Sequence, residues 1–293
     1  MTSRLALLIN PRSGRGLSSS AVLSVRDRLA AGGFAVSVLS GRDAVESSAL
    51  AHRAVAERYD VLAVMGGDGS VHLALQAVVD SATALAVIPS GTGNDAARAL
   101  GLPRGDLLAA ADVVLTGRPR TIDTARAGER SYLTVLASGF DSRVNERANA
   151  MSRPSGRLRY IVATLAELGV FEPIPYTVTL DGTRLSVEAM LVAVGNTSTY
   201  GGGLKMCEGA EVDDGLLDVV VIGPMSRLEL MAVYPRLFNG SHVNHSAYSR
   251  HRVRRVTVEA PDAVAYADGE RLGPLPLSVE VAAGSVDVVV AAA

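Results

Sequence analysis

VLAVMGGDGSVHLAL, residues 61–75, joins an apolar run to a glycine-rich acidic turn and then to a helical pattern. The same order returns in LAVIPSGTGNDAARAL, residues 85–100. A glycine turn between a buried strand and a helix lets backbone N–H groups close on a phosphate, and the helix dipole favours the anion there. Asp68 and Asp95 add carboxylates where a metal–nucleotide would sit. The two stretches together indicate phosphoryl transfer from a nucleoside triphosphate.

A third glycine turn follows the first apolar run of the chain, in LALLINPRSGRG, residues 5–16. Arg12 and Arg15 can meet phosphate charge beside the free N–H groups of this turn. None of the three turns is a Walker A sequence or a G-x-G-x-x-G fingerprint. One such turn alone would be an ordinary strand-to-helix connection, but three on one face of one α/β unit favour a phosphate site.

The motifs resemble those of the diacylglycerol kinase catalytic superfamily, and specifically its soluble bacterial lipid-kinase branch, with sphingosine and ceramide kinases as relatives. The matching stretches are NPRSG at 10–14, GGDGS at 66–70, PSGTGND at 89–95, DDGLLD at 213–218 and DGE at 268–270. They span essentially the whole chain. One departure is Ser70, where the family usually has threonine, and the hydroxyl is kept.

The resemblance implies a nucleotide site and a catalytic set. The implied nucleotide contacts are Asn10, Pro11, Arg12, Ser13, Gly14, Ser40, Gly66, Gly67, Asp68, Gly69, Ser70, Val71, His72 and Thr92. The implied catalytic residues are Asp68, Asp95, Asp123 and Glu270. Glu270 takes the place of the family's proposed general base, which removes the proton of the acceptor hydroxyl as the γ-phosphate transfers.

Structural interpretations of the same residues stay open. Asp68 is also suited to capping the helix that follows it, and the Asn94-Asp95 pair is suited to the same role in its own helix. Asp123 is a lone aspartate at a strand end, a position that is usually structural. Residues 268–270 read equally as a hairpin turn with exposed carboxylates.

A metal site is implied in the second half of the chain. The resemblance places a structural Mg²⁺ at residues 213–215, held by the Asp214 carboxylate and by carbonyl groups matching Glu211 and Leu216. Hard oxygen ligands in a turn, completed by waters, suit Mg²⁺. Without the resemblance, Asp-Asp-Gly reads first as a turn.

The hydrophobic pattern predicts an α/β half followed by a β-rich half. Residues 1–120 alternate strands and helices, which indicates a doubly wound, nucleotide-binding parallel sheet with the three glycine turns at its carboxyl edge. Residues 121–293 show short strands and hairpins, with helical patterns near 156–169 and 226–238. We expect a C-terminal β-sandwich-like acceptor domain, with the active site in the interdomain cleft. The resemblance implies that the last strand returns to the first domain.

Composition narrows the class of protein. The 293 residues are 48% hydrophobic with mean hydropathy +0.25, typical of a globular chain, and a net charge of −2 argues against nucleic-acid binding. A single cysteine, Cys207, excludes an internal disulfide and fits a reducing compartment. No apolar stretch reaches the roughly 18 residues of a membrane span, and no signal peptide is evident. We therefore expect a cytoplasmic protein that binds the membrane surface peripherally during turnover. The sequence leaves open whether it forms a homodimer.

These observations predict an ATP- and Mg²⁺-dependent kinase that phosphorylates a lipid hydroxyl, first of all diacylglycerol to phosphatidic acid. The alternatives are a sphingoid, ceramide or other lipid kinase, a metabolite kinase of the NAD-kinase type, and a catalytically silent nucleotide-binding regulator. The basic run at 249–255 is either a solvated strand start or a contact for anionic headgroups. The apolar stripe of the helix near 156–169 either packs in the core or lines a lipid-tail pocket.

Overall fold

The computed structural model describes residues 2–10, 17–154, 157–168 and 170–292. The chain divides into two compact units, Met1–Thr124 with Ala282–Ala293, and Ala125–Val281. Four of the predicted nucleotide-binding residues lie outside the described residues: Pro11, Arg12, Ser13 and Gly14. Among the described residues, no helix is long and apolar enough to span a bilayer.

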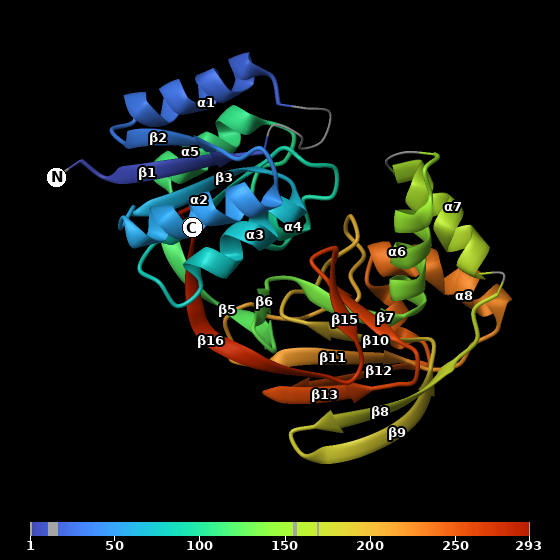
Figure 1. Cartoon of the computed structure of the whole chain (residues 1–293). Helices are drawn as coiled ribbons and strands as arrows, with labels where there is room; N and C mark the ends of the chain where they lie inside the picture. Colours follow the sequence, from blue (N-terminus) through green and yellow to red (C-terminus); the bar gives the residue numbers. More distant parts are fainter. Residues whose placement is uncertain (1, 11–16, 155–156, 169, 293) are drawn as a thin grey trace. The chain divides into compact units, whose positions relative to one another are not determined.

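The first unit is built on a parallel sheet with strand order β2-β1-β3-β4 (Figure 1). Its strands are β1 (Arg4–Ile9), β2 (Ala35–Ser40), β3 (Val61–Gly66) and β4 (Ala84–Pro89). Its helices are α1 (Ser19–Ala31), α2 (Ala44–Ala56), α3 (Asp68–Val78), α4 (Asp95–Ala99) and α5 (Leu107–Thr116). Helix α1 packs with α5 and α2 packs with α3, so helices cover both faces of the sheet. The predicted doubly wound arrangement is confirmed.

Strands β3 and β4 are buried along their whole length. Continuous apolar sequence is expected for a parallel strand whose two faces are both covered by helices. Ile9 pairs with Met65, and Gly66 pairs with Pro89, so β1, β3 and β4 end at the same edge of the sheet. This register brings the connections after these three strands to one edge, which is where open α/β sheets bind ligands.

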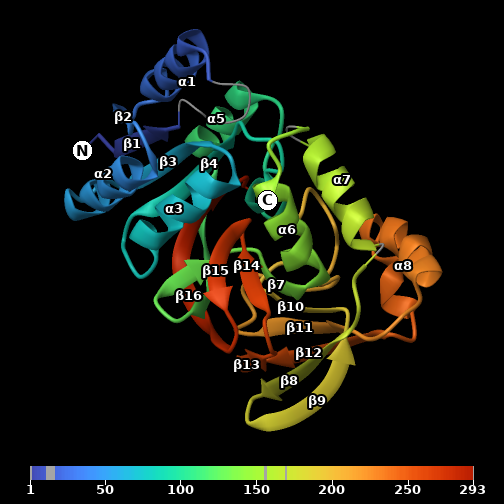
Figure 2. The same cartoon turned by 45° about the vertical axis from the view of Figure 1, so that its right-hand side comes forward.

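The second unit is antiparallel and contains two layers of strands (Figure 2). One sheet has the order β12-β11-β10-β7-β14-β15, and the other strands run β13-β8-β9 beside the start of β16. The strands are β5 (Arg118–Ala127), β6 (Arg130–Tyr132), β7 (Val135–Gly139), β8 (Ile174–Leu180), β9 (Thr183–Ala189), β10 (Leu191–Gly195), β11 (Leu217–Ile222), β12 (Tyr248–Val253), β13 (Arg255–Glu259), β14 (Val264–Ala267), β15 (Glu270–Pro274) and β16 (Leu277–Val290). Val178, Val192, Val219 and Val256 are fully buried in one core cluster that draws on both layers. A β-sandwich-like second domain is therefore confirmed.

Three helices accompany the sandwich, namely α6 (Phe140–Ala150), α7 (Arg157–Leu168) and α8 (Arg227–Val233). Two short 3₁₀ helices follow α8, η1 (Tyr234–Phe238) and η2 (Ser241–Asn244). Ala148 of α6, Ala163 of α7 and Leu230 of α8 meet in one small apolar cluster, which holds the three helices together.

The last long strand, β16, pairs in both units. Glu280 pairs with Arg255 of β13, and Val288 pairs with Leu85 of β4. The hydrophobic pattern predicts two strands here, at 275–281 and 286–290, but the structure has one. The residues between them, Ala-Ala-Gly-Ser at 282–285, are small and carry no strand pattern, and the strand bends at Gly284, where φ is 58°.

Candidate active site

Asp68 connects the two glycine turns of the first unit. It is the first residue of α3, directly after β3. Its carboxylate accepts the backbone N–H groups of Asn94 at 2.7 Å, Asp95 at 2.6 Å and Ala96 at 3.4 Å. These donors form the start of α4, where helical N–H groups have no partner within the helix. Asp68 therefore caps a helix, but it is the helix after the other glycine turn.

The glycines let the two turns approach closely. A Cβ atom on Gly91 would lie 2.6 Å from the Cα atom of Gly67, and one on Gly93 would lie 2.7 Å from Oδ2 of Asp68. Asn94 has a φ of 52°, and its side-chain amide bonds back to Gly91 in the same turn. Its Oδ1 accepts the Gly91 N–H at 3.0 Å, and its Nδ2 donates to the Gly91 carbonyl at 2.9 Å.

We expect Gly91→Ala to separate the two turns and weaken nucleotide binding. The new methyl group meets backbone, which cannot move aside as a flexible side chain would. Overpacking of this kind costs about 1–3 kcal/mol, and a loss of about 1.4 kcal/mol in binding is tenfold in Kd. Titration of the protein with ATP checks this. Gly223→Ala is the matched control, since a Cβ there makes only ordinary contacts from 3.5 Å. Equal ATP affinity in the two variants would contradict the close approach.

The first turn also joins this cluster. Nδ2 of Asn10 donates to Oγ of Ser70 at 3.2 Å, and the backbone N–H of Ser90 donates to the Gly66 carbonyl at 2.9 Å. Ser40 ends β2 opposite Ile9, at the same edge of the sheet. The structure thus brings the described part of the predicted nucleotide set together at this edge.

The members of that set differ in how they could contact a ligand. The side chain of Val71 is buried, so a contact from this residue would come from its backbone. His72 is half-buried, and Thr92 is exposed. Ser40 is exposed. The nucleotide roles of these residues stay predictions.

Asp95 sits at the first position of α4. Its side chain is 14% exposed, and its Oδ1 lies 3.8 Å from Nε of Arg98.

Asp123 holds two strands of the first unit together. Its side chain is 3% exposed, and its Oδ1 accepts the Gly284 N–H at 2.7 Å. Beside it, Oγ1 of Thr124 and Oγ of Ser285 are hydrogen-bonded at 2.8 Å. These contacts tie β5 to β16. Asp123 therefore has a structural role in joining these strands, and its catalytic role stays a prediction.

Glu270 is presented by a tight turn between β14 and β15. Asp268 and Gly269 have φ of 52° and 83°, as a type I′ hairpin turn requires. Asp268 accepts hydrogen bonds from Leu133 N at 3.0 Å, from Thr134 N at 2.9 Å and from Thr134 Oγ1 at 2.6 Å. Glu270 follows as the first, exposed residue of β15.

Asp268 is a positioning residue that the sequence analysis did not select. Its carboxylate fixes the turn, and the turn fixes the backbone of Glu270. The available signal was the Asp-Gly pair itself, which favours an αL turn but does not reveal the partners of the carboxylate.

The predicted Mg²⁺ site at Glu211, Asp214 and Leu216 does not form an open cation site. Oδ1 of Asp214 accepts the Leu216 N–H at 2.9 Å, and its Oδ2 forms an ion pair with Arg252. Across the described residues, no group of three or more His, Cys, Asp or Glu side chains could hold a metal. A cation would have to displace Arg252 from Asp214. The predicted set consists of one carboxylate and two carbonyl groups, and the metal assignment stays a prediction.

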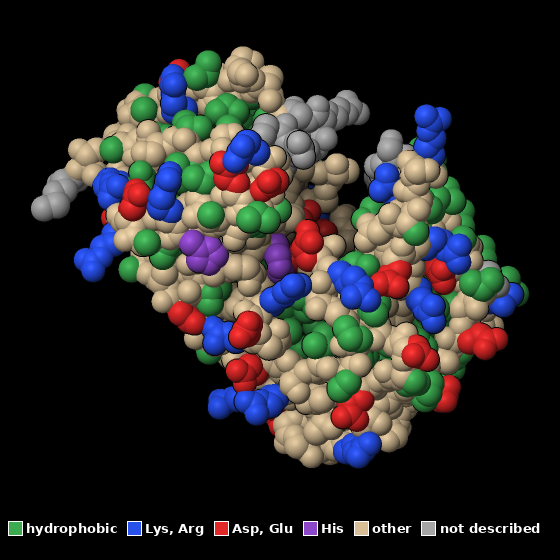
Figure 3. Space-filling view, viewed as in Figure 1, with side chains coloured by type: hydrophobic (Ala, Val, Ile, Leu, Met, Phe, Trp, Pro, Cys, Tyr) green, Lys and Arg blue, Asp and Glu red, His purple; other side chains and the backbone are tan. Residues whose placement is uncertain are grey.

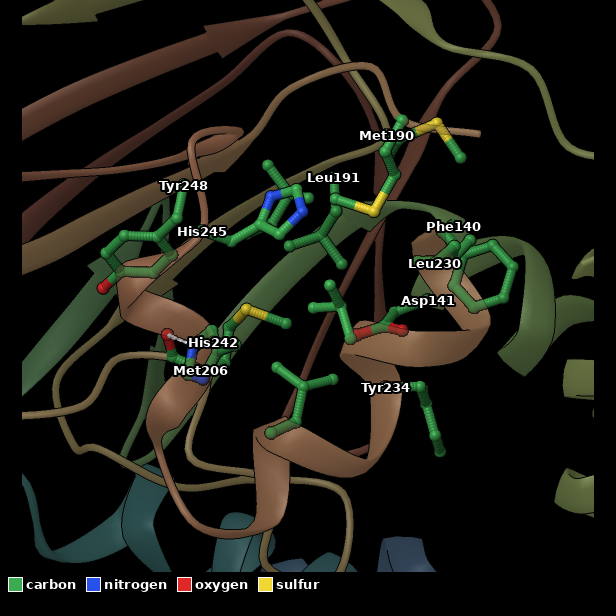
Figure 4. Close-up of a pocket in the computed structure, with 14 residues that line it drawn as sticks. Phe140, Asp141, Met190, Leu191, Met206, Leu230, Tyr234, His242, His245 and Tyr248 are labelled. Atoms are coloured by element: carbon green, nitrogen blue, oxygen red, sulfur yellow. Dashed lines mark hydrogen bonds between the residues drawn. The ribbon is translucent and has the colours of Figure 1, made fainter. Parts of the chain in front are cut away.

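The second unit contains a pocket that sequence analysis did not find. It is small, with a cavity volume of about 40 Å³, and it is partly open to solvent. Most of its wall is apolar, from residues such as Phe140, Met190, Met206, Leu230 and Leu237 (Figure 4). The residues come from five separate segments between 140 and 248, so no local pattern marks them. A pocket with this apolar lining suits contact with hydrocarbon.

A parallel sheet with clustered glycine turns, joined to a β-sandwich-like unit with an apolar pocket, defines a two-domain enzyme class that handles nucleotides. Family models agree along the chain. Residues 4–127 match the diacylglycerol kinase catalytic domain, and residues 134–290 match the YegS C-terminal NAD kinase beta sandwich-like domain. The chain belongs to the diacylglycerol kinase family and is a lipid kinase.

Individual relatives agree with this assignment. The chain is 41% identical over 291 residues to a diacylglycerol kinase of Mycobacterium tuberculosis, covering 97% of this chain and 94% of the relative. A crystal structure of a putative diacylglycerol kinase from Bacillus anthracis matches with a TM-score of 0.83 at 24% identity, over 98% of this chain and 96% of the other. An NAD kinase from Archaeoglobus fulgidus in complex with ATP has a TM-score of 0.55 at 12% identity, covering 98% and 93%. These two structures show a shared fold.

Proposed function

We propose that this protein transfers the γ-phosphate of Mg²⁺–ATP to the free hydroxyl of diacylglycerol, giving phosphatidic acid, ADP and a proton. The observation that carries the lipid acceptor is the apolar pocket of the second unit, whose lining suits contact with hydrocarbon. A polar acceptor such as NAD would offer no hydrocarbon to contact the apolar side chains that line this pocket. The 41% identity to the mycobacterial diacylglycerol kinase supports the glycerolipid over other lipids.

The glycine turns of the first unit supply the phosphate-binding groups in this proposal. Asp68 holds the start of α4, so the two glycine turns lie close together before the nucleotide arrives. Turns preorganised in this way can stabilise the charge on the transferring phosphoryl group. Mg²⁺ enters with ATP as part of the substrate and neutralises charge on the β- and γ-oxygens.

Glu270 acts as the general base in this proposal. It is exposed on a fixed turn, so its carboxylate is free to receive the proton of the acceptor hydroxyl. A carboxylate is basic enough because the transition state is loose and requires little deprotonation before attack.

Labelled ATP with a panel of acceptors in mixed micelles tests the proposal. The panel holds diacylglycerol, a sphingoid base, a ceramide and NAD, each with and without Mg²⁺. Label on diacylglycerol alone, and only with Mg²⁺, is the expected result. Label on the sphingoid base or ceramide would move the acceptor to that lipid. Label on NAD would place the chain with metabolite kinases, and ATP binding without any transfer would support a regulator.

We further propose that α7 and α8 meet the membrane when the lipid is collected. Leu158 and Leu165 of α7 are 62% and 60% exposed, and Leu228 of α8 is 80% exposed. Hydrophobic and charged side chains mix on the surface over these helices (Figure 3). Leu230 and Val233, also on α8, line the pocket. One helix therefore borders both the pocket and solvent, which supports entry of a lipid from this side.

The double variant Leu158→Glu/Leu165→Glu should bind vesicles at least about tenfold more weakly, because two apolar contacts become charged. Vesicle sedimentation measures this, and turnover of a soluble short-chain diacylglycerol should stay near wild type. Val45→Glu is the matched control, since Val45 is 80% exposed on α2 of the first unit. Unchanged vesicle binding in the double variant would remove α7 from the membrane contact.

The basic run 249–255 is a weaker candidate for this contact than the sequence suggested. Arg250 forms an ion pair with Asp218, and Arg255 pairs with Glu280 at 2.5 Å. Arg252 pairs with Asp214, as described above. Charges that already have acidic partners attract anionic lipid less, so we expect neutralising this run to change vesicle binding little.

A further inference from the structure

The pocket of the second unit is apolar, yet two of its lining residues hold a buried polar atom without a partner. Among the described residues, Oδ2 of Asp141 and the hydroxyl of Tyr248 are buried and make no hydrogen bond. Buried polar groups are almost always hydrogen-bonded, and each exception has a cost of about 1–3 kcal/mol. Two exceptions on the wall of one pocket indicate that its ligand carries polar groups as well as hydrocarbon.

Of these two groups, the Asp141 carboxyl is the more costly to leave without a partner. It is the second residue of α6, immediately after Phe140, and its carboxyl group lies among the side chains that line the pocket (Figure 4). The backbone before it is fixed, because Gly139 has a φ of 103° and a Cβ there would lie 2.5 Å from the Met190 carbonyl oxygen. The strand-to-helix corner therefore holds Asp141 at the pocket.

Burial raises the pKa of Asp141 from 3.8 to about 7, so a large fraction is protonated near neutral pH. The other titratable groups on the pocket wall are His242, His245, Tyr234 and Tyr248. Burial lowers the pKa of His242, which keeps its ring neutral. On the neighbouring α7, Glu167 is paired with Arg147 at 2.5 Å. A hydrocarbon chain in the pocket would remove more water and favour the neutral carboxylic acid further.

A neutral carboxylic acid has one O–H to donate. The polar groups of a diacylglycerol other than its hydroxyl are two ester groups, whose carbonyl oxygens are acceptors. A sphingoid amine offers a cation instead and would prefer a charged carboxylate. The protonated side chain in an apolar wall therefore matches an ester.

We propose that Asp141 is a specificity-determining residue that donates a hydrogen bond from its carboxylic acid to an ester carbonyl oxygen of the lipid in the pocket. This assignment rests on the proposed function for its choice of lipid, but it concerns binding and not phosphoryl transfer. It predicts that the pocket prefers an ester-linked chain to an ether-linked chain of equal length.

Binding of dioctanoylglycerol and of the matching dioctyl ether, measured by titration calorimetry, tests the assignment without catalysis. The wild type should bind the ester about tenfold more tightly, the worth of one hydrogen bond. Asp141→Leu should bind both lipids alike, because it keeps the γ-branched shape and removes the donor. Asp141→Asn should keep the ester preference, because its amide still donates. Equal binding of the two lipids by the wild type, or an ester preference kept by Asp141→Leu, would overturn the assignment.

Stability provides a second readout that needs no lipid. The folded-state pKa of Asp141 lies above its unfolded value, so the favourable contribution at low pH is lost as pH rises through about 7. Asp141→Asn removes this loss, while His242 and His245 are common to both proteins and cancel in the comparison. The variant should gain thermal stability over wild type at about pH 8 and not at about pH 4. No gain at the higher pH would show that the carboxyl group is not buried as described.

Different results would contradict the proposed phosphoryl transfer and the assignment of Asp141. If wild type binds the ester with the expected preference but transfers no phosphate to it, the proposed function fails and the Asp141 assignment stands. If wild type phosphorylates diacylglycerol but binds ester and ether alike, the function stands and the assignment fails.

Discussion

Asp68→Ala should lower kcat by at least roughly 10²-fold while the protein stays folded, because misplacement of reacting groups by about 1 Å can cost that much. In the structure, the Asp68 carboxylate holds the N–H groups of Asn94 and Asp95 at the start of α4. Without it, these groups lose their partner and the second glycine turn loses its contact with the first. The phosphate-binding donors are then no longer preorganised. Steady-state kinetics with diacylglycerol and ATP checks the loss.

Hydrogen exchange separates this structural effect from a direct effect on the metal–nucleotide. The amides of Asn94 and Asp95 should exchange faster in Asp68→Ala than in wild type when no nucleotide is present. Asp43→Ala is the matched control, since Asp43 also caps a helix of the first unit by accepting the Glu46 N–H at 2.8 Å. It should lose about 1 kcal/mol of stability and little activity. Near-normal turnover in folded Asp68→Ala would rule out a role for this carboxylate in the site.

Glu270→Gln should keep ATP affinity and lower kcat by roughly 10²–10⁴-fold, if proton transfer is the whole contribution of this residue. The amide has nearly the same volume but cannot accept the proton of the acceptor hydroxyl. The turn that carries it is anchored by Asp268, so the substitution should leave the backbone in place. Glu188→Gln, at another exposed glutamate of the second unit, is the control and should be indistinguishable from wild type.

Asp123 is the competing candidate for the base. Its carboxylate is buried and bonded to the Gly284 N–H, so Asp123→Asn should also change stability. Unfolding must therefore be measured beside turnover and nucleotide affinity. If Glu270→Gln turns over normally while folded Asp123→Asn is inactive with unchanged ATP affinity, the base is Asp123.

The first unit was predictable because its signals are local. Each strand, glycine turn and helix start lies within about fifteen residues, and parallel strands bring their turns to one edge. The contact from Asp68 to Asn94 was not predictable, because it joins side chain and backbone across 26 residues. The sequence offered two roles for Asp68, capping its own helix or organising the nucleotide. The structure shows that the carboxylate caps a different helix.

The second unit was less predictable because its patterns are ambiguous. The pattern of residues 185–194 predicts one strand. In the structure the chain passes from β9 in one sheet to β10 in the other at Met190. The apolar run AMLVAV at 189–194 continues across this point, so the sequence does not mark it. Helix α6 was missed because FDSRVNERANA is mostly polar and its apolar stripe is reduced to Phe140, Val144 and Ala148. The pocket and Asp141 depend on that helix, so both were out of reach of sequence reasoning. The interdomain position of the active site stays a prediction.

The most direct test of the account is a single-turnover measurement of phosphatidic acid formation. Purified protein, γ-labelled ATP, Mg²⁺ and diacylglycerol in mixed micelles are mixed with enzyme in excess, and lipid label is counted over time. The account predicts that wild type transfers the label to diacylglycerol in one exponential phase, and that Asp68→Ala and Glu270→Gln slow this phase by roughly 10²-fold or more. Absence of labelled lipid with wild type that binds ATP and diacylglycerol would contradict it.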